Sequence, residues 1–238
     1  PILPFNTPCS GVKRLAWSEF DFADARKVKN ILGGTVNDVV LTILSEAVSR
    51  YVKMHGHKTK DKVVRFMVPV SLRQKDKRGS LGNLISILPV EIPLKSSGFH
   101  ERFKFVNAKT AVMKETRLAE SFLTFGAMYS MLPAPLQSAL GQIADVPVPP
   151  FNMVATNVPG PQIPLYLVGK KLVKQYPYVP IGYGLGLGCA IFSYNQVLYF
   201  GFSSDAQAMP DVEVFKEIVD QVFVELIETA DEIDHASE

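Results

Sequence analysis

The sequence predicts an α/β fold in which helices pack on a sheet. Segments with the helical spacing of apolar residues alternate along the chain with short segments of β-type composition. The chain has 238 residues, of which 47% are hydrophobic, enough for one large domain or two small ones with a substantial core. Neither an internal repeat nor a long linker divides it, so we expect a single domain.

The clearest helix is expected from residue 36 to about residue 52. Thr35 and Asp38 stand in the T-x-x-D relation of a capping box, and Gly56 follows the last turn, where a glycine cap belongs. The apolar residues of this helix form one continuous stripe: Val36, Val39, Val40, Ile43, Leu44, Ala47, Val48, Tyr51 and Val52.

Shorter patterns predict the remaining elements. Buried or alternating β-type runs predict strands over residues 63–70, 84–92 and 151–157. A hairpin is expected from residues 184–193 and 197–203, with its turn at Asn195 and Gln196. Helical spacing predicts further helices over residues 24–32, 99–122 and 211–233.

Charge and cysteine usage exclude several classes of protein. Lysine and arginine number 25 against 23 aspartate and glutamate residues, a net charge of +2 that is too even to indicate nucleic-acid binding. Cys9 and Cys189 lie far apart and form no C-x-x-C motif, so neither a disulfide framework nor a zinc ribbon is predicted. We expect a reducing, cytoplasmic environment. The N-terminal residues show no basic region followed by an apolar region, so we expect no signal peptide. Because the chain begins with Pro1 instead of methionine, we expect it to be part of a longer polypeptide.

The middle of the chain is poor in charge. Between residues 121 and 204 the only charged residues are Asp145, Lys170, Lys171 and Lys174. A membrane-spanning helix needs about 20 uninterrupted apolar residues, and prolines, glutamines or glycines interrupt every apolar run here. Two interpretations remain for this region: a deeply buried core, or a surface that meets lipid or an acyl chain.

The sequence contains none of the common catalytic motifs G-x-S-x-G, P-loop, H-E-x-x-H and G-x-G-x-x-G. One unusual feature is the spacing by two of Gly182, Gly184, Gly186 and Gly188, which on a strand would leave one side bare. A strand face without side chains predicts that another group lies close to the backbone. The approaching group is either a helix or neighbouring sheet, or an extended ligand chain in a tunnel.

The four histidines lack the partners of a catalytic base. His55 and His57 lie with Asp61 where the long helix ends, which favours a helix cap and a solvated turn over a metal or acid–base cluster. His100 lies near a helix start, and His235 lies in an acidic tail. The residues alone therefore indicate no base.

Asn37 and Asp38 mark the start of the long helix. Asp38 can bond backbone amides there and interact favourably with the helix dipole, which alone explains an aspartate. Asn37 has no such explanation, and the free amides of a helix start could help it to hold an active-site loop. A basic run over residues 50–78 is either a solvated face or, in part, a site for an anionic cofactor tail.

Six segments together point to one family. They are GGTVNDVVL (33–41), VPVSLR (68–73), LGNLIS (81–86), TNVPGP (156–161), PLYLVG (164–169) and SYNQVLYFGFSSD (193–205). Through these segments the chain resembles the C-terminal half of the bacterial wax ester synthase and diacylglycerol acyltransferase family. That family is a branch of the coenzyme A-dependent acyltransferase superfamily, which also includes chloramphenicol acetyltransferase and peptide-synthetase condensation domains.

The resemblance implies a fold and an activity. The fold is α/β with a mixed sheet flanked by helices, one half of a chloramphenicol-acetyltransferase-like fold, with residues 1–238 as the C-terminal domain. The activity is O-acyl transfer from acyl-CoA to a long-chain alcohol or diacylglycerol, forming wax ester or triacylglycerol. In the family, a histidine of an H-H-x-x-x-D-G motif in the N-terminal half acts as general base on the acceptor hydroxyl. This chain lacks that motif, and HGHKTKD (55–61) does not replace it.

The resemblance also implies partners and site residues. The expected partners are the N-terminal half, acyl-CoA as substrate and the lipid acceptor, with no bound cofactor, no metal and no nucleic acid. Asn37 and Asp38 are expected to support catalysis. Substrate or channel contacts are expected from Arg73, Asn83, Asn157, Gly160, Gly184, Gly186, Ser193 and Tyr194.

Lipid substrates imply a cytoplasmic protein attached peripherally to a membrane or lipid droplet. The expected membrane contact consists of aromatic, methionine and leucine side chains: Phe122, Phe125, Met128, Tyr129, Met131 and Leu132. The alternative interpretation is that these residues fill the hydrophobic core. Two other functions stay open. One is a non-catalytic binding or scaffold protein that retains the half-fold, and the other is a different acyltransferase of the superfamily, such as a condensation domain, which TNVPGP and SYNQ disfavour.

Overall fold

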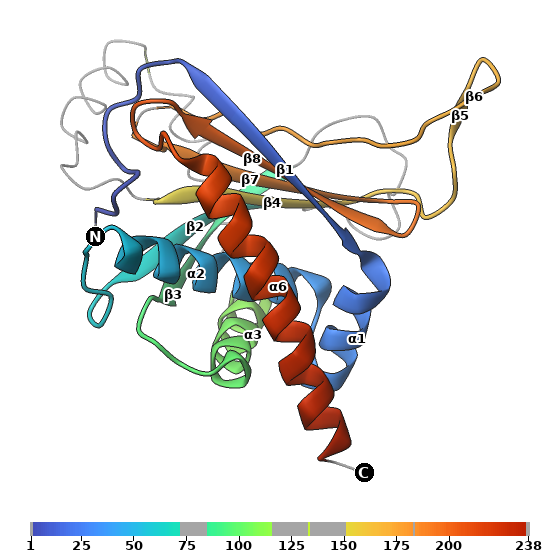
Figure 1. The fold of residues 1–238 in the computed structure, drawn as a ribbon, viewed down its shortest axis with the longest axis horizontal. Helices are drawn as coiled ribbons and strands as arrows, with labels where there is room; N and C mark the ends of the chain where they lie inside the picture. Colours follow the sequence, from blue (N-terminus) through green and yellow to red (C-terminus); the bar gives the residue numbers. More distant parts are fainter. Residues whose placement is uncertain (1, 72–84, 116–132, 134–150, 183, 237–238) are drawn as a thin grey trace.

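A computed structural model describes residues 2–71, 85–115, 133, 151–182 and 184–236 (Figure 1). The described strands are β1 (Lys13–Asp21), β2 (Val63–Ser71), β3 (Ile85–Pro93), β4 (Met153–Pro159), β5 (Tyr166–Leu167), β6 (Lys170–Lys171), β7 (Leu187–Tyr194) and β8 (Val197–Asp205). The described helices are α1 (Phe22–Leu32), α2 (Val36–Met54), α3 (Phe99–Glu115) and α6 (Val212–His235).

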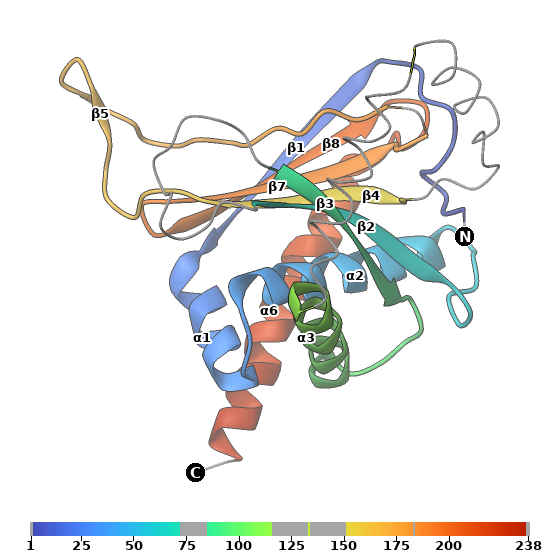
Figure 2. The ribbon, with the colours of Figure 1, turned by 180° about the vertical axis from the view of Figure 1, so that it is seen from behind.

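Six strands form one mixed sheet in the order β1-β8-β7-β4-β2-β3. β4 runs parallel to both β2 and β7, whereas the pairs β1–β8, β7–β8 and β2–β3 are antiparallel. The four helices cover the same face of this sheet, and the β5–β6 hairpin lies away from them (Figures 1 and 2). The predicted α/β fold with a mixed sheet and packed helices is therefore confirmed.

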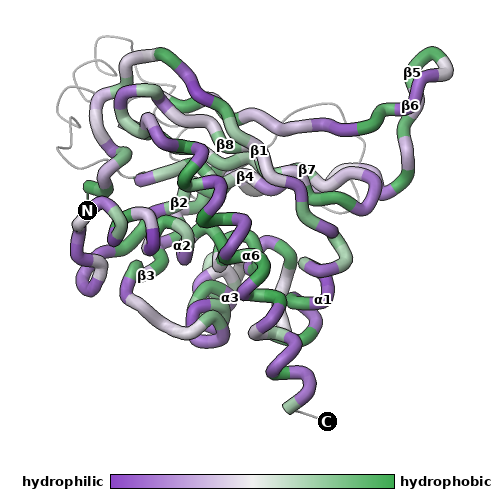
Figure 3. Tube along the Cα trace, viewed as in Figure 1, coloured by the Kyte–Doolittle hydropathy of each residue, from purple (hydrophilic) through white to green (hydrophobic). Residues whose placement is uncertain are grey.

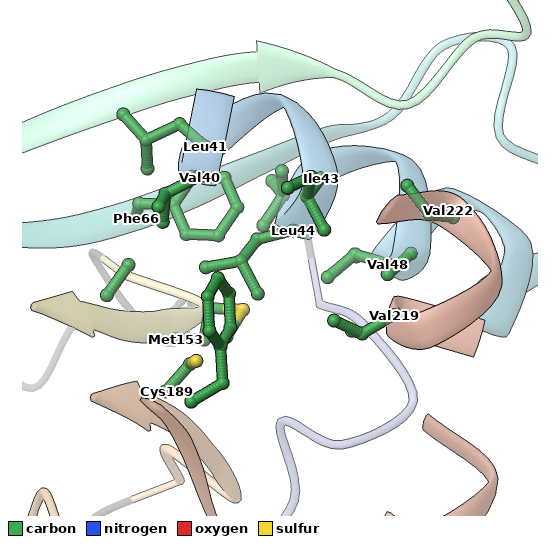
Figure 4. Close-up of a cluster of buried hydrophobic side chains, with 14 of the residues drawn as sticks. Val40, Leu41, Ile43, Leu44, Val48, Phe66, Met153, Cys189, Val219 and Val222 are labelled. Atoms are coloured by element: carbon green, nitrogen blue, oxygen red, sulfur yellow. The ribbon is translucent and has the colours of Figure 1, made fainter. Parts of the chain in front are cut away.

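Helix α2 lies at the centre of the hydrophobic core. Thirteen of its 19 residues are buried, so it is covered on nearly every side rather than along one stripe. Figure 4 shows its apolar side chains between Met153 of β4 and Cys189 of β7 on one side and Val219 and Val222 of α6 on the other. Each such side chain stabilises the fold by about 1.5–3 kcal/mol when fully buried.

The ends of α2 match the predicted caps. The Thr35 side chain accepts from the backbone N–H of Asp38, and the Asp38 carboxylate accepts from the backbone N–H of Thr35, which completes the capping box. At the other end His55 is the C-cap residue, and Gly56 follows it with a left-handed φ of 75°. The prediction of a cap and turn at this end is confirmed.

Polar contacts fasten α2 to α6. The Arg50 guanidinium binds both carboxylate oxygens of Glu225, at 2.8 and 2.5 Å, and also binds Glu46 at 2.9 Å. These hydrogen bonds, chiefly the one to Glu225, raise the pKa of Arg50. The Tyr51 hydroxyl donates to Asp211 at 2.6 Å, and burial followed by this bond raises the pKa of Tyr51. Two separate polar contacts, Arg50–Glu225 and Tyr51–Asp211, therefore join α2 to α6 and its N-cap.

Several strands differ from the prediction. The edge strand β1 was not predicted, because the charged residues Lys13, Arg14 and Glu19 interrupt its apolar residues on both faces. Of the glycine row only Gly188 lies on a strand: Gly184 adopts a left-handed φ of 82°, and β7 begins only at Leu187. The β7–β8 hairpin and the β2–β3 pair are confirmed. The predicted extension of helix 99–122 beyond residue 115 lies outside the described residues.

The part of the chain that the structure describes contains no single helix long and apolar enough to cross a membrane. Only α1 and α2 taken together, across a bend of 96°, have the length and composition of such a segment.

A buried carboxylate ties the N-terminal segment to the end of β8. Asp205 is fully buried and accepts backbone N–H bonds from Ser10, Gly11, Gln207 and Ala208 at 2.9–3.2 Å. Burial by itself would raise the pKa of Asp205, but these four donors lower it well below its usual range. Asp205 therefore stays ionised inside the protein.

We predict that Asp205→Asn lowers the free energy of unfolding at neutral pH by more than about 2 kcal/mol, because four backbone donors lose a buried, charged acceptor. A lowered folded-state pKa stabilises the fold above the unfolded-state value of about 3.9, and this stabilisation is lost as the pH falls below it. Urea unfolding should therefore show the difference from wild type narrowing between about pH 5 and pH 2.5. Asp61→Asn, at an exposed position, is the control; a wild type–Asp205→Asn difference independent of pH would contradict the assignment.

Candidate functional site at the ends of β4 and β7

Four of the predicted site residues meet at one edge of the sheet. β4 and β7 are parallel, with Asn157 opposite Ile191 and Pro159 opposite Ser193, so their carboxyl ends lie together. In α/β sheets, ligands commonly bind outside the carboxyl ends of the strands. Gly160 and Tyr194 complete this group.

Hydrogen bonds join the two sequence motifs found here. The Ser193 Oγ accepts from the backbone N–H of Gly160 at 3.1 Å and from the Gln162 side-chain amide at 3.0 Å. The Gln162 Oε1 in turn accepts from the backbone N–H of Gln196 at 2.9 Å. A side chain at Gly160 would collide with the Ser193 carbonyl and the Phe192 ring, so only glycine permits this contact.

Tyr194 supports a projecting segment, residues 160–182, which we call the arm. The arm contains the β5–β6 hairpin and leaves the sheet between β4 and β7 (Figure 1). The buried Tyr194 hydroxyl accepts from the backbone N–H of Leu165 at 2.8 Å and donates to the carbonyl of Leu172 at 2.9 Å. It therefore bridges both limbs at the base of the arm.

The arm itself makes the close approach that the glycine spacing predicted. A Cβ on Gly188 would lie 2.8 Å from Val179 and 2.9 Å from Ile181, and one on Gly201 would meet the Pro177 carbonyl. An extended segment of the same chain thus occupies this face of β7 and β8, rather than a helix or neighbouring sheet. Gly186 instead packs on the Phe5 carbonyl.

Gly184, the other predicted glycine of this row, lies in the loop before β7. A Cβ added to it would meet no atom within 4 Å, and its left-handed backbone explains the glycine. Arg73 and Asn83 lie outside the described residues, as do residues 122–132, the expected lipid contact.

Asp38 is fully buried and cross-links two helices. Beyond the capping box, its carboxylate accepts from the Thr110 hydroxyl at 2.6 Å and from the Asn107 amide at 3.1 Å, both on α3. The sequence analysis missed Asn107 and Thr110, because a bond between residues about 70 positions apart leaves no local pattern. The structural role considered for Asp38 is confirmed and extended.

Asn37 differs from its neighbour. Its side chain is partly buried, and within the described residues it has no hydrogen-bond partner. The same holds for Asn157, which lies on β4 in step with the core residues Met153 and Ala155 and so on the helix-covered side. A partly buried amide without a partner has both donors and its acceptor free for a ligand.

His55 is held by the fold, and Cys189 is buried in the core. The His55 Nδ1 lies 3.0 Å from the Tyr51 carbonyl, and its Nε2 lies 3.2 Å from Asp211. Burial raises the pKa of the Cys189 thiol well above its usual value, which suppresses the nucleophilic thiolate. Among the described residues, no group of three histidine, cysteine, aspartate or glutamate side chains could hold a metal ion.

A cavity of about 420 Å³ lies between β3 and α3, away from these residues; its lining includes Ile92, Lys95, Arg102 and Phe105. The Arg102 guanidinium is almost fully buried and donates to the carbonyls of Pro93 and Lys95 at 2.9 Å. This arginine therefore has a structural role, and none of the predicted site residues that the structure describes lines the cavity.

We predict that Asp38→Ala lowers the free energy of unfolding by about 2–4 kcal/mol, because it removes a cap and leaves donors of Asn107 and Thr110 unpaired. Asn37→Ala should change it by less than about 0.5 kcal/mol, since no described bond is lost. Urea denaturation followed by circular dichroism gives both values. Equal losses in the two variants would show that Asn37 also has a structural role.

Comparison with known proteins places these features in a family. Residues 81–227 match the model of the WS/DGAT C-terminal domain. A probable diacylglycerol O-acyltransferase of Mycobacterium tuberculosis, Tgs4, is 31% identical over 231 residues, which cover 93% of this chain and 46% of the relative. Another from the same species, Tgs1, is 28% identical over 207 residues, or 87% of this chain and 45% of the relative. The chain thus spans about half the length of these relatives.

Solved structures share the fold. The wax ester synthase/diacylglycerol acyltransferase of Marinobacter aquaeolei superposes with a TM-score of 0.74 at 24% identity, covering 97% of this chain and 52% of that one. An epimerization domain of tyrocidine synthetase superposes with a TM-score of 0.61 at 11% identity, covering 95% and 52%. The family match extends over more than half of the sequence, and the chain therefore belongs to the WS/DGAT C-terminal domain family.

Proposed function

We propose that residues 1–238 form the C-terminal domain of an acyl-CoA-dependent O-acyltransferase. The enzyme transfers a fatty acyl group to a long-chain alcohol or diacylglycerol, yielding wax ester or triacylglycerol. The observation that carries this proposal is the match of residues 81–227 to the WS/DGAT C-terminal domain. The names of the relatives, diacylglycerol O-acyltransferases, support the same reaction class.

The reaction needs a base, and we place it on the half of the protein that precedes this chain, within an H-H-x-x-x-D-G motif. The acceptor hydroxyl gives its proton to that histidine while its oxygen attacks the thioester carbonyl. The C–S bond to coenzyme A then breaks, and the histidine returns the proton to the departing sulfur, which leaves as the free thiol. The environment of His55 supports this placement, because both of its ring nitrogens face acceptors within the fold.

This chain would contribute walls and polar contacts to the channel between the two halves. The side-chain amides of Asn37 and Asn157, which have no hydrogen-bond partner among the described residues, are the candidates for contacts with acyl-CoA or the acceptor. The polar groups of Gly160, Ser193 and Tyr194 already form hydrogen bonds at the base of the arm. These three residues would therefore position the arm instead of binding the substrate directly. Roles for Arg73 and Asn83 in the channel remain part of the proposal.

We further propose that the enzyme works at the surface of a membrane or lipid droplet in the cytoplasm. Its acceptors partition into lipid, so an enzyme that meets them there needs only peripheral attachment. The candidate contact is the charge-poor stretch that includes Phe125 and Met128.

We expect release of free coenzyme A thiol from palmitoyl-CoA, with hexadecanol or diolein as acceptor, only when this chain is joined to its preceding half. The chain alone should show none, because it supplies no base. A thiol reagent measures the release. Turnover by the chain alone would contradict the placement of the base, and a full-length protein that binds acyl-CoA without turnover would favour a non-catalytic binding role.

In the full-length enzyme, Asn37→Ala should lower turnover more than about tenfold, equivalent to about 1.4 kcal/mol in the barrier. Its melting temperature should stay within about 2 °C of wild type, because no described hydrogen bond is lost. Asn30→Ala, at an exposed asparagine of α1, is the matched control. An Asn37→Ala enzyme with wild-type turnover would remove Asn37 from the site.

A further inference from the structure

The cavity between β3 and α3 lies apart from the candidate functional site. β3 is an edge strand of the sheet, and Figures 1 and 2 show it beside α3. Its last residue, Pro93, pairs with Val63 at the amino end of β2, which runs parallel to β4. Asn157 lies near the carboxyl end of β4, so the cavity lies at the opposite ends of these strands. Its volume of about 420 Å³ is within the range of small-molecule sites.

Part of the cavity lining is apolar. Ile92 of β3 is buried, Pro93 is half-buried and Phe105 of α3 is 37% exposed, and all three line the cavity. Figure 3 shows hydrophobic and hydrophilic residues alternating along α3, so Phe105 lies among polar neighbours. The three side chains offer a ligand a hydrocarbon surface, as the walls of small-molecule pockets commonly do.

The lining also contains a buried cation. The Arg102 side chain is 2% exposed, and its charge is matched by Glu46 at 2.8 Å. Its Nε is buried, and no described residue accepts a hydrogen bond from it. Buried donors in native proteins are generally paired with protein, water or a ligand. Arg102 therefore has one donor for which the described part of the fold supplies no acceptor.

The charged side chains of the lining include an unpaired cation. The Lys95 ammonium binds Glu101 at 3.5 Å. Lys104 is exposed, and neither its ammonium nor the Ser97 hydroxyl has a partner in the described part of the chain. A lysine and a hydroxyl can together bind a carboxylate through charge-assisted hydrogen bonds. A ligand with several negative charges would also face Glu101, so the lining favours a singly charged anion.

From these observations we infer that the cavity binds the anion of a long-chain fatty acid. Its carboxylate would lie at Lys104 and Ser97, and its alkyl chain would lie along Ile92 and Phe105. A lysophospholipid has the same two parts, an anionic group and an alkyl chain, so both ligands are compared in the test. The inference goes beyond the proposed function, in which coenzyme A carries the fatty acyl group.

The test titrates the full-length protein with sodium palmitate in a calorimeter. S-hexadecyl-coenzyme A is present at saturation, so that an acyl-CoA site does not contribute to the measured heat. Palmitate should bind at least about tenfold more tightly than hexadecanol, which lacks the charge, or acetate, which lacks the chain. Hexadecanol or acetate binding as tightly as palmitate would overturn the inference.

Variants test whether palmitate lies in the cavity. Lys104→Glu should weaken palmitate binding at least about tenfold, because a like charge replaces the cation. Lys104→Gln repeats the test without charge reversal and should weaken binding less. The melting temperature of both should stay within about 2 °C of wild type, because Lys104 is exposed. Lys29→Glu, the same change at a lysine of α1 outside the lining, should leave binding unchanged. Wild-type binding in both Lys104 variants would contradict the assignment.

Photo-crosslinking locates the bound lipid directly. A palmitate analogue with a diazirine in its alkyl chain should label residues 92–105 in wild type and lose this labelling in Lys104→Glu. Labelling confined to other segments would overturn the inference. Tighter, Lys104-dependent binding of lysophosphatidylglycerol would also overturn it, because the cavity would then be a site for a phospholipid head group. None of these measurements requires acyl transfer, so a failure of the proposed function would be seen separately.

Discussion

The burial of α2 against the sheet is the constraint on which the rest of the structure depends. The helix contacts β-strand side chains on one side and α6 on the other, so its Val, Ile and Leu residues define the core (Figure 4). A helix buried on nearly all sides cannot leave its terminal polar groups unsatisfied. Accordingly, hydrogen-bonded side chains satisfy polar groups at both ends of α2.

Those contacts explain why the neighbouring residues Asn37 and Asp38 differ in their hydrogen bonding. At the N-terminus the Asp38 carboxylate is fully committed to Thr35, Asn107 and Thr110. At the C-terminus Tyr51 and His55 share the Asp211 carboxylate. Asn37 stands beside this rigid cap but takes no part in it among the described residues. A fixed backbone with an uncommitted amide is the arrangement that a site needs to place a hydrogen bond on a substrate.

Features that depend on residues close together in the chain could be predicted from the sequence. The capped helix α2 and the turn at Asn195–Gln196 follow from spacing and from residues that tolerate a positive φ, and the structure contains both. The α3 partners of Asp38 and the partners of Ser193 and Tyr194 could not be predicted, because each of these bonds joins residues far apart in the chain. The glycine row misled for a related reason: alternation indicates a strand only while φ stays extended, and Gly184 interrupts it.

The edge where β4 and β7 end connects the two faces of the sheet. Side chains alternate along a strand, so Asn157 follows Met153 and Ala155 to the helix-covered side, whereas Tyr194 follows Gly188 to the side of the arm. One pair of parallel strands thus holds, on one face, an amide with no hydrogen-bond partner among the described residues and, on the other face, the base of the arm. Because β4 and β7 are bonded in register there, a displacement of the arm would act on the strand that carries Asn157. The position of the arm and the position of the Asn157 side chain are therefore linked through the paired ends of these two strands.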